Sequence, residues 1–434
     1  MGFTESIFDI YKFVDFDKYC PRCSHQPKAG TCEPCNECLD IPARPYSHMP
    51  EFFDETKPEP KKVKGMPTSL RRVTEYLYEA DYADIDYDAA KEYLKKDEDI
   101  IAMPGACSAF KDGDYYCRNF DWTYDHSAEF IVDVQPPKES DRFRTKGICG
   151  GIKMFTEDFV KDDANDNNEL YAILPFLMRD GMNEKGLFAE INVVPTWDPD
   201  NKNKSVPTER EVEEISALML VRYILDNFST AYTAIMYLKY FVSIYFPKAL
   251  HDMGYECHWM IGDSRSTYCV EVIDNEVVIT DITAIPYMTN FHIHNVEFED
   301  DGTVYTPDTQ DETHNAVETN HIHPLGAGLE RYNFIVRSRD MSYLDYMDIL
   351  KGLQYTNAYN PYKRWFTEFV GLRGLQVDSD PEDFEPVLEA AHEEYLNRDR
   401  DTGKTWQTCH SVVYNPITYN MAVKQQEYGY YMGF

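Results

Sequence analysis

The stretch CSAFKDGDYYCRNFD, which runs from Cys107 to Asp121, constrains the fold more strongly than any other part of the chain. An Asp112-Gly113 pair lies between two short runs rich in apolar and aromatic residues, and this arrangement predicts a tight β-hairpin. Because a hairpin places its two strands side by side, we expect Arg118 and Asp121 on the return strand to lie next to Cys107. The stretch therefore predicts a thiol, a guanidinium and a carboxylate within one local unit. Taken alone, the same three residues are also typical of a buried cysteine beside a surface ion pair.

Two later regions show clear periodicity. From Cys257 to Asp281, three period-two runs separated by turns predict an antiparallel meander. Residues 208–246 instead carry apolar side chains at helical spacing and predict two amphipathic helices, each of which buries one face. Strands that cluster apart from paired helices indicate an α+β fold.

The first 106 residues differ from the rest of the chain. Residues 43–72 are rich in proline and carry a local basic run, which is typical of a linker or of a strap laid over a surface. Residues 68–96 then show helical spacing and predict two helices, the second running from about Asp88 to just before Asp97. We therefore interpret residues 1–106 as an accessory region or prosegment and residues 107–434 as the main domain.

A cluster of cysteines lies within the accessory region. Two CxxC pairs are followed by a fifth cysteine, and the five residues are Cys20, Cys23, Cys32, Cys35 and Cys38. Paired CxxC knuckles let four thiolates face one centre, so the first four cysteines predict a structural tetrahedral zinc site, with Cys38 as an alternative ligand. The competing interpretation is a set of free thiols in a surface loop.

The composition excludes several classes of protein. A formal net charge of −34 is unsuited to binding nucleic acid, which requires a basic face. No stretch offers the ~18 consecutive apolar residues of a membrane-spanning helix. The N-terminus lacks the basic start, the apolar run and the cleavage site of a secretory signal, and the cysteines are odd in number, at 11. These features favour the reducing cytoplasm over an oxidising compartment.

Four later landmarks extend the pattern of the hairpin. They are the segment DGMNEKGL (180–187) with Asn192 on the strand after it, the His258-Trp259 strand, Asn290 in YMTN, and Arg331 in GLERY. Together with the Cys107 hairpin, these segments resemble the choloylglycine hydrolase family, which contains bile salt hydrolases and penicillin V acylases and is similar to the acid ceramidase group. One departure is Glu330, which precedes Arg331 where the family has serine. The resemblance implies a structural rather than a catalytic role for His258.

The resemblance implies a fold and a mode of activation. The fold is the N-terminal-nucleophile hydrolase fold, an αββα four-layer sandwich, here preceded by an accessory segment. Activation is self-cleavage of the Ala106–Cys107 bond, after which the new α-amine can serve as the base for the Cys107 thiol. The reference pKa values, ~7.7 to 8.0 for an α-amine and ~8.5 for a thiol, suit that proton transfer. A prosegment of 106 residues is longer than in many relatives and nearer to the ceramidase arrangement.

The resemblance also assigns roles around the nucleophile. Asp121 would orient the α-amine, and Arg118 would stabilise the thiolate. The Asn290 side chain and the backbone N–H of Asn192 would hold the oxyanion, while Arg331 would support the charges of the site. No cofactor is expected for catalysis.

The expected activity is hydrolysis of a linear amide through an acyl-enzyme. Candidate substrates are conjugated bile salts, penicillin V-like compounds and N-acyl amides, all of them small molecules. Two alternatives stay open: an acyltransferase of the same superfamily, and a non-catalytic, zinc-stabilised interaction protein. Family habit suggests a homo-oligomer, and the prosegment is either released, retained after cleavage or used as a lid.

Overall fold

The computed structural model describes residues 65–74, 76–96, 107–124, 128–150, 168–195, 213–247, 250, 255–294, 296, 298, 300, 302–304, 326–327, 329–339, 346–355, 405–425 and 431–434. The five cysteines of the expected zinc site and Ala106 lie outside these residues, as does most of the proline-rich segment. The zinc site therefore stays a prediction.

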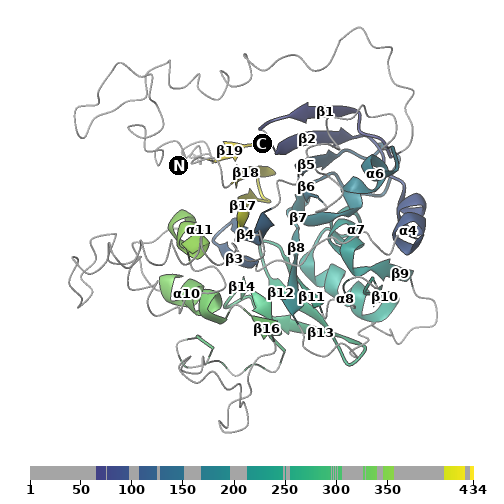
Figure 1. The fold of residues 1–434 in the computed structure, drawn as a ribbon. Coiled ribbons are helices and arrows are strands. Elements are labelled where there is room, and N and C mark those ends of the chain that lie inside the picture. The colour runs from purple at the N-terminus through teal and green to yellow at the C-terminus, as the bar shows by residue number, and fades with distance from the viewer. Residues whose placement is uncertain are drawn as a thin grey trace, which may run out of the picture.

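Two sheets form the centre of the molecule (Figure 1). The nine-stranded sheet has the order β1-β2-β5-β6-β7-β8-β11-β12-β13, and its strands are β1 (Ser69–Arg72), β2 (Leu77–Tyr82), β5 (Glu129–Val134), β6 (Thr145–Cys149), β7 (Met178–Asn183), β8 (Phe188–Pro195), β11 (Tyr255–Gly262), β12 (Thr267–Ile273) and β13 (Glu276–Asp281). The six-stranded sheet has the order β14-β3-β4-β17-β18-β19, and its strands are β3 (Ser108–Asp112), β4 (Tyr115–Tyr124), β14 (Tyr287–Met288), β17 (Thr405–Asn415), β18 (Asn420–Gln425) and β19 (Met432–Gly433). The predicted hairpin is β3–β4 and the predicted meander is β11–β12–β13, so both expectations are confirmed.

Helices cover the outer face of each sheet (Figure 1). Beside the larger sheet lie α4 (Tyr87–Lys96), α6 (Asn168–Ile173), α7 (Leu220–Asn227) and α8 (Ala231–Phe241), with the short 3-10 helices η2 (Leu174–Phe176) and η3 (Ala217–Met219). Beside the smaller sheet lie α10 (Leu329–Arg339) and α11 (Tyr346–Tyr355). Because α7 and α8 contact strands of the larger sheet while α10 and α11 contact strands of the smaller one, the molecule has the expected αββα order of layers. No helix among the described residues has the length and apolar character needed to cross a membrane.

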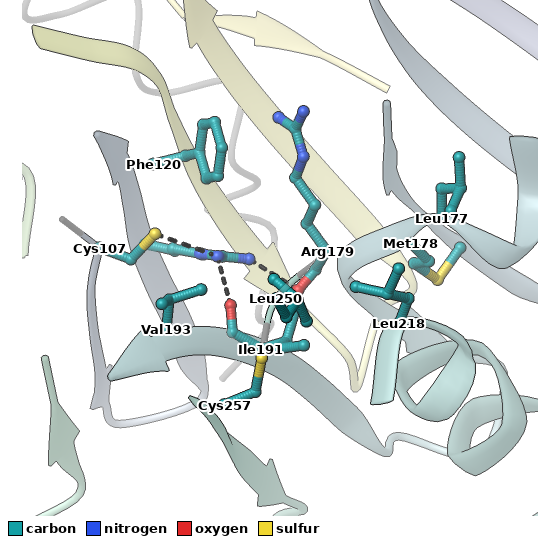
Figure 2. Close-up of a pocket in the computed structure, with 11 residues that line it drawn as sticks. Cys107, Phe120, Leu177, Met178, Arg179, Ile191, Val193, Leu218, Leu250 and Cys257 are labelled. Atoms are coloured by element: carbon teal, nitrogen blue, oxygen red, sulfur yellow. Dashed lines mark hydrogen bonds between the residues drawn. The ribbon is translucent and has the colours of Figure 1, made fainter. Parts of the chain in front are cut away.

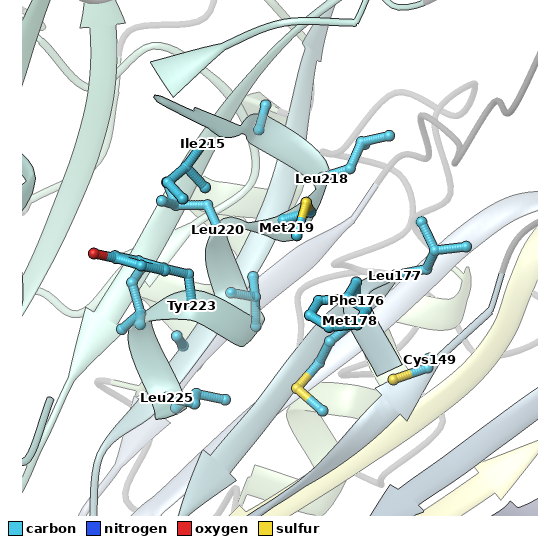
Figure 3. Close-up of a cluster of buried hydrophobic side chains, with 14 of the residues drawn as sticks. Cys149, Phe176, Leu177, Met178, Ile215, Leu218, Met219, Leu220, Tyr223 and Leu225 are labelled. Atoms are coloured by element: carbon cyan, nitrogen blue, oxygen red, sulfur yellow. The ribbon is translucent and has the colours of Figure 1, made fainter. Parts of the chain in front are cut away.

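The hydrophobic core has two main parts. One part lies between the larger sheet and its helices, where α7 and η3 pack against η2 and the start of β7 (Figure 3). The other part contains side chains of both sheets and of α10 and α11, among them Phe188, Val413 and Phe334. The second part joins the two sheets by apolar packing, whereas the first joins the larger sheet to its helices.

The N-terminal segment departs from its prediction. The expected helix near residues 68–82 is wrong, because Ser69–Arg72 and Leu77–Tyr82 form β1 and β2. Tyr78, Ala80 and Tyr82 alternate along β2 and all enter the same core, and β2 pairs in parallel with β5. A distant strand therefore overrides the local helical spacing. The expected second helix is confirmed as α4, and the division of the chain at Cys107 stays a prediction.

The helical region also differs in part. Residues Glu213–Ser216 and Val242–Tyr245, both expected to be helical, form the strands β9 and β10, which pair in parallel. The helices α7 and α8 are confirmed, and they make up the connection that two parallel neighbours require. A further short pair, β15 (Asn290–Phe291) with β16 (Gly326–Ala327), lies beside β8.

A close contact between the sheets depends on one glycine. The Tyr116 ring stacks on Phe188, with ring centroids 4.3 Å apart, and its hydroxyl donates a hydrogen bond to the Asp263 carbonyl oxygen at 3.0 Å. A Cβ atom at Gly262 would overlap the Tyr116 hydroxyl and ring. Residue 262 therefore has to lack a side chain for the sheets to keep this spacing.

We expect Gly262→Ala to lower the free energy of unfolding by about 1 to 3 kcal/mol, the usual cost of overpacking a dense core. Chemical denaturation of the variant and the wild type measures the difference. Tyr116→Phe removes the hydroxyl that the new methyl group would meet, so the double variant should lose less than the sum of the two single losses. Full additivity would contradict this account.

Candidate active site

The hairpin positions Cys107 beside Arg118. Gly113 adopts φ +57° at the turn, and the register of β3 and β4 pairs Ala109 with Arg118. Cys107 immediately precedes β3 and is 1% exposed. Arg118 points its Nη2 at the Cys107 Sγ, with 3.4 Å between the two atoms. The sequence-predicted thiol and guanidinium are thus in contact.

The larger sheet holds the Arg118 guanidinium in place. Nη1 donates to Asp180 Oδ2 at 2.5 Å and to the Arg179 carbonyl oxygen at 2.7 Å, both on β7. Nη2 donates to the Ile191 carbonyl oxygen on β8 at 2.6 Å, and Nε lies 3.2 Å from Glu190 Oε2. A side chain from the smaller sheet is therefore fixed by groups of the opposite sheet.

Asp121 and Arg331 lie on the other face of β4. Arg331 on α10 donates through Nη1 to the Cys107 carbonyl oxygen at 2.5 Å and to Ser108 Oγ at 2.8 Å, and the same nitrogen lies 3.5 Å from Asp121 Oδ2. The Thr408 hydroxyl on β17 donates to Asp121 Oδ1 at 2.5 Å. Arg331 therefore contacts the main chain of Cys107 and connects it to the Asp121 carboxylate.

Asn290 is connected to this group and to β8. Its Oδ1 accepts a hydrogen bond from Arg331 Nη2 at 2.6 Å, and its Nδ2 donates to the Val193 carbonyl oxygen at 2.6 Å. A primary amide carries two Nδ2 hydrogens, so this nitrogen can donate to a second acceptor as well as to Val193. Five of the six sequence-predicted residues are therefore linked by direct contacts: Cys107, Arg118, Asp121, Asn290 and Arg331.

Asn192 is placed differently. The Ile191 and Val193 carbonyl groups face Arg118 and Asn290, so the alternation of a strand directs the Asn192 backbone groups to the other side, toward His258 of β11. The Asn192 side chain donates to Glu190 Oε1 at 3.3 Å. The backbone N–H groups on the Cys107 side of β8 are consequently those of Ile191 and Val193, and not that of Asn192.

A pocket opens beside the thiol (Figure 2). Its walls are mainly apolar and are formed by residues of β4, β7, β8, η3 and the segment before β11: Phe120, Met178, Val193, Leu218 and Leu250. Cys107 lies at one side of this space, and Arg118 also lines it. The arrangement can receive an apolar group whose reacting atom reaches the sulfur.

Burial and charge set the protonation of the site. Burial raises the pKa of the Cys107 thiol, and Arg118 opposes that shift. Burial also raises the pKa of Asp121 to about 6 and that of Glu190 to about 8, although Arg331 favours the first carboxylate and Arg118 the second. Glu190 is therefore largely protonated at neutral pH. The thiol needs both a base and the remaining positive potential of Arg118 to ionise.

His258 does not supply that base. Its Nε2 lies 2.8 Å from the Thr289 carbonyl oxygen and so donates to it, while Nδ1 faces Cys269 Sγ at 3.9 Å and Glu271. This buried imidazole ties the residue before Asn290 to β11, in keeping with a structural role.

Several residues of the site were missed in the sequence. Asp180 and Glu190 bind Arg118, Thr408 binds Asp121, and Glu129 with His410 lies behind Phe120. Asp180 opens the DGMNEKGL segment, and Glu190 shares the alternation of Asn192, so both had a signal. The last three depend on how β17 and β5 are placed against β4, which no local pattern gives.

We expect Glu190→Gln to become more stabilising as pH rises. The pKa of Glu190 is raised to about 8 in the folded protein. Above the ordinary pKa of a glutamate the folded state therefore binds more protons than the unfolded state. The wild type consequently loses stability as the pH rises from about 5 to 8. The variant lacks this loss, so the variant-minus-wild-type unfolding free energy should grow by on the order of 1.4 kcal/mol per pH unit. Denaturation at several pH values measures it, with Glu79→Gln on β2 as the control for losing a carboxylate. A difference that does not change with pH would refute the assignment.

Comparisons with known proteins identify the family of the chain. The model of the family described as linear amide C–N hydrolases, choloylglycine hydrolase family, matches residues 108–332, more than half of the 434 residues. No curated protein matches the chain.

Matches among solved structures include two enzymes. A mutant of the conjugated bile acid hydrolase from Clostridium perfringens shares 16% identity, with 76% of this chain and 92% of that chain covered and a TM-score of 0.38. Penicillin V acylase from Agrobacterium tumefaciens shares 13% identity, with 76% and 85% covered and a TM-score of 0.34. By the match of more than half of its length to the family's model, the chain belongs to the choloylglycine hydrolase family of linear amide C–N hydrolases.

Proposed function

We propose that Cys107 is the nucleophile of this amide hydrolase and that it acts after cleavage of the Ala106–Cys107 bond. The observation that carries the proposal is the pair of contacts on Cys107: Arg118 on its sulfur at 3.4 Å and Arg331 on its carbonyl oxygen at 2.5 Å. One cation favours the thiolate, and the other fixes the main chain from which an α-amine would project.

The reaction needs two steps. The Cys107 sulfur attacks the amide carbon while its proton moves to the α-amine, which Asp121 orients. The tetrahedral oxyanion collapses, the C–N bond breaks, and the leaving amine takes the proton from the α-ammonium. Water then attacks the thioester and gives its proton to the α-amine. The C–S bond breaks, the carboxylic acid leaves, and the α-ammonium returns the proton to the Cys107 sulfur. All protons are accounted for without a cofactor.

Two donors would stabilise the oxyanion. The first is the second Nδ2 hydrogen of Asn290, whose amide is oriented by Arg331 and by the Val193 carbonyl oxygen. For the second donor we propose the backbone N–H of Val193, because this group lies on the Cys107 side of β8. A donor of this kind can contribute ~3 to 4 kcal/mol to the transition state.

The pocket favours an apolar acyl group. Its walls offer aliphatic, thioether and aromatic side chains, whereas its polar groups gather near the sulfur. Conjugated bile acids and penicillin V, the compounds named for the two similar structures, both fit this description, as do N-acyl amides. No disulfide joins any two of the six described cysteines, and we keep the cytoplasm as the location in this proposal.

Intact-mass spectrometry tests the activation step. We expect wild-type protein to give two fragments that divide before Cys107, and Cys107→Ala to give one chain, because the thiol itself attacks the Ala106 carbonyl. A single chain in both proteins would refute self-cleavage.

The same measurement tests the acyl-enzyme when penicillin V or a glycine-conjugated bile salt is added. The fragment that begins at Cys107 should gain the mass of the acyl group, and Asn290→Asp should slow this gain ~10²- to 10³-fold. Asn333→Asp is the matched control, since Asn333 is a buried amide of α10 that binds Val304 and not Cys107. An added amine that captures the acyl group in place of water would identify an acyltransferase.

The accessory segment should stay bound after cleavage. Leu77 and Ala80 of β2 are fully buried, β2 pairs with β5, and the Thr74 hydroxyl donates to Gln425 Oε1 at 2.6 Å. Its release would expose this apolar face and open a sheet edge. We expect the two fragments to elute together in native buffer and to separate in urea. An engineered protease site between residues 97 and 106 supplies the cut if none occurs, and separation in native buffer would contradict retention.

A further inference from the structure

The last strand of the site contains a β-bulge. In β17, Thr408 pairs with Asp121 and His410 pairs with Phe120, so Cys409 is the extra residue between them. Asp121 and Phe120 point to opposite faces of β4, and the bulge therefore sends Thr408 to one face and His410 to the other. Thr408 donates a hydrogen bond to Asp121 on the outer face of β4, which is the face toward α10 and α11. His410 lies on the inner face, toward the larger sheet, and its role there needs a separate explanation.

His410 is fully buried between the sheets. Its Nδ1 lies 2.6 Å from Glu129 Oε1 on β5, and its ring stacks on Phe120 with 5.2 Å between centroids and 12° between planes. Arg179 lies over the same Phe120 ring at 4.0 Å and pairs with Glu129 at 3.0 Å. The imidazole is thus fixed in position by a carboxylate and an aromatic ring.

The opposite ring nitrogen faces the site. His410 Nε2 lies 3.9 Å from Asp180 Oδ2, the same oxygen that accepts the hydrogen bond from Arg118, and it has no hydrogen-bond partner among the described residues. Asp180 is held from its other side by the Tyr414 hydroxyl on Oδ1. A continuous series of contacts therefore runs from His410 through Asp180 and Arg118 to the Cys107 sulfur.

The charges along this series support one another. Burial alone would lower the pKa of His410, but Glu129 and Asp180 raise it above its ordinary value. Burial alone would raise the pKa of Asp180, but Arg118, His410 and Tyr414 hold it below its ordinary value. Two charged groups, Glu129 and Asp180, contact the His410 ring directly. Arg179 pairs with Glu129 and Arg118 pairs with Asp180, while Asp121 interacts with the ring electrostatically from the opposite face of β4.

We propose that His410 is a positioning residue for the nucleophile. Its cationic ring keeps Asp180 ionised and turned toward Arg118, and Arg118 in turn stabilises the Cys107 thiolate. A purely structural ring would need only the bond to Glu129 and the contact with Phe120, and its charge would not influence Cys107. The inference rests on the proposed role of Cys107, but its test measures alkylation rather than turnover, so the two can fail separately.

The test is the pH dependence of Cys107 alkylation by iodoacetamide, followed for the Cys107 peptide by mass spectrometry. In His410→Asn the amide nitrogen can replace Nδ1 toward Glu129, whereas Nε2 and the positive charge are lost. We expect the midpoint of alkylation to rise by about one pH unit, which is about tenfold in rate below the midpoint. Ser411→Ala is the matched control, since Ser411 is the next residue of β17 and binds Asn119 on the outer face. Equal midpoints in both variants would overturn the proposal.

A double variant tests the route through Asp180. If His410 acts through Asp180, the combination of His410→Asn with Asp180→Asn should shift the midpoint no further than Asp180→Asn alone. Additive shifts would show that His410 acts on Cys107 by another path and would overturn the positioning role.

A measurement on the wild type covers the case in which the variants fail to fold. The imidazole resonances of His410, assigned in histidine-labelled protein, report the pH at which the ring loses its charge. The alkylation rate of Cys107 should show an inflection at that same pH. A titration of His410 without such an inflection would contradict the proposal.

Discussion

The Arg118 guanidinium, buried between the two sheets, is the interaction on which the site depends. It comes from the smaller sheet, yet four of its contacts lie on β7 and β8 of the larger sheet, and one reaches the Cys107 sulfur. A buried cation of this kind is costly unless it is paired, and removing it would leave Asp180 uncompensated as well. The group that favours the thiolate is therefore also the group that fixes how the sheets meet, so stability and reactivity cannot be varied independently at this position.

The site uses both faces of β4. Arg118 and Phe120 face the larger sheet, whereas Asp121 faces the helix layer, where α10 delivers Arg331. Cys107 lies at the end of the neighbouring strand, where it contacts groups from both faces. The four-layer architecture has a direct chemical consequence: the guanidinium on the Cys107 sulfur comes from between the two sheets, and the guanidinium on the Cys107 carbonyl oxygen comes from the helix layer.

Much of this arrangement was predictable, and the exceptions have a common cause. The hairpin and the meander follow from local turn chemistry, as at Asp274-Asn275, where both residues take positive φ. Five of the six expected site residues lie in contact, and all five were predicted from the motifs of the family. The wrong helix near residues 68–82 and the missed His410 both depend on strand pairing between distant segments. A bulge at Cys409 adds one residue to β17 and so reverses which of the following side chains face inward. Neither the composition nor the periodicity of the sequence indicates such a bulge.

Asn192 and Val193 make the same point for the main chain. A sequence motif identifies side chains. Which backbone N–H can bind the oxyanion depends instead on the alternation of a strand, in which successive residues point their N–H groups to opposite sides. Once the Ile191 and Val193 carbonyl groups face Arg118 and Asn290, the N–H of Val193 must lie on that side and the N–H of Asn192 must face β11. The identity of the side chain at residue 193 hardly matters for such a donor, which is why a valine can occupy the position. What β8 has to preserve is its register against β11, because a shift of one residue would exchange the two N–H groups and remove the proposed donor from the site.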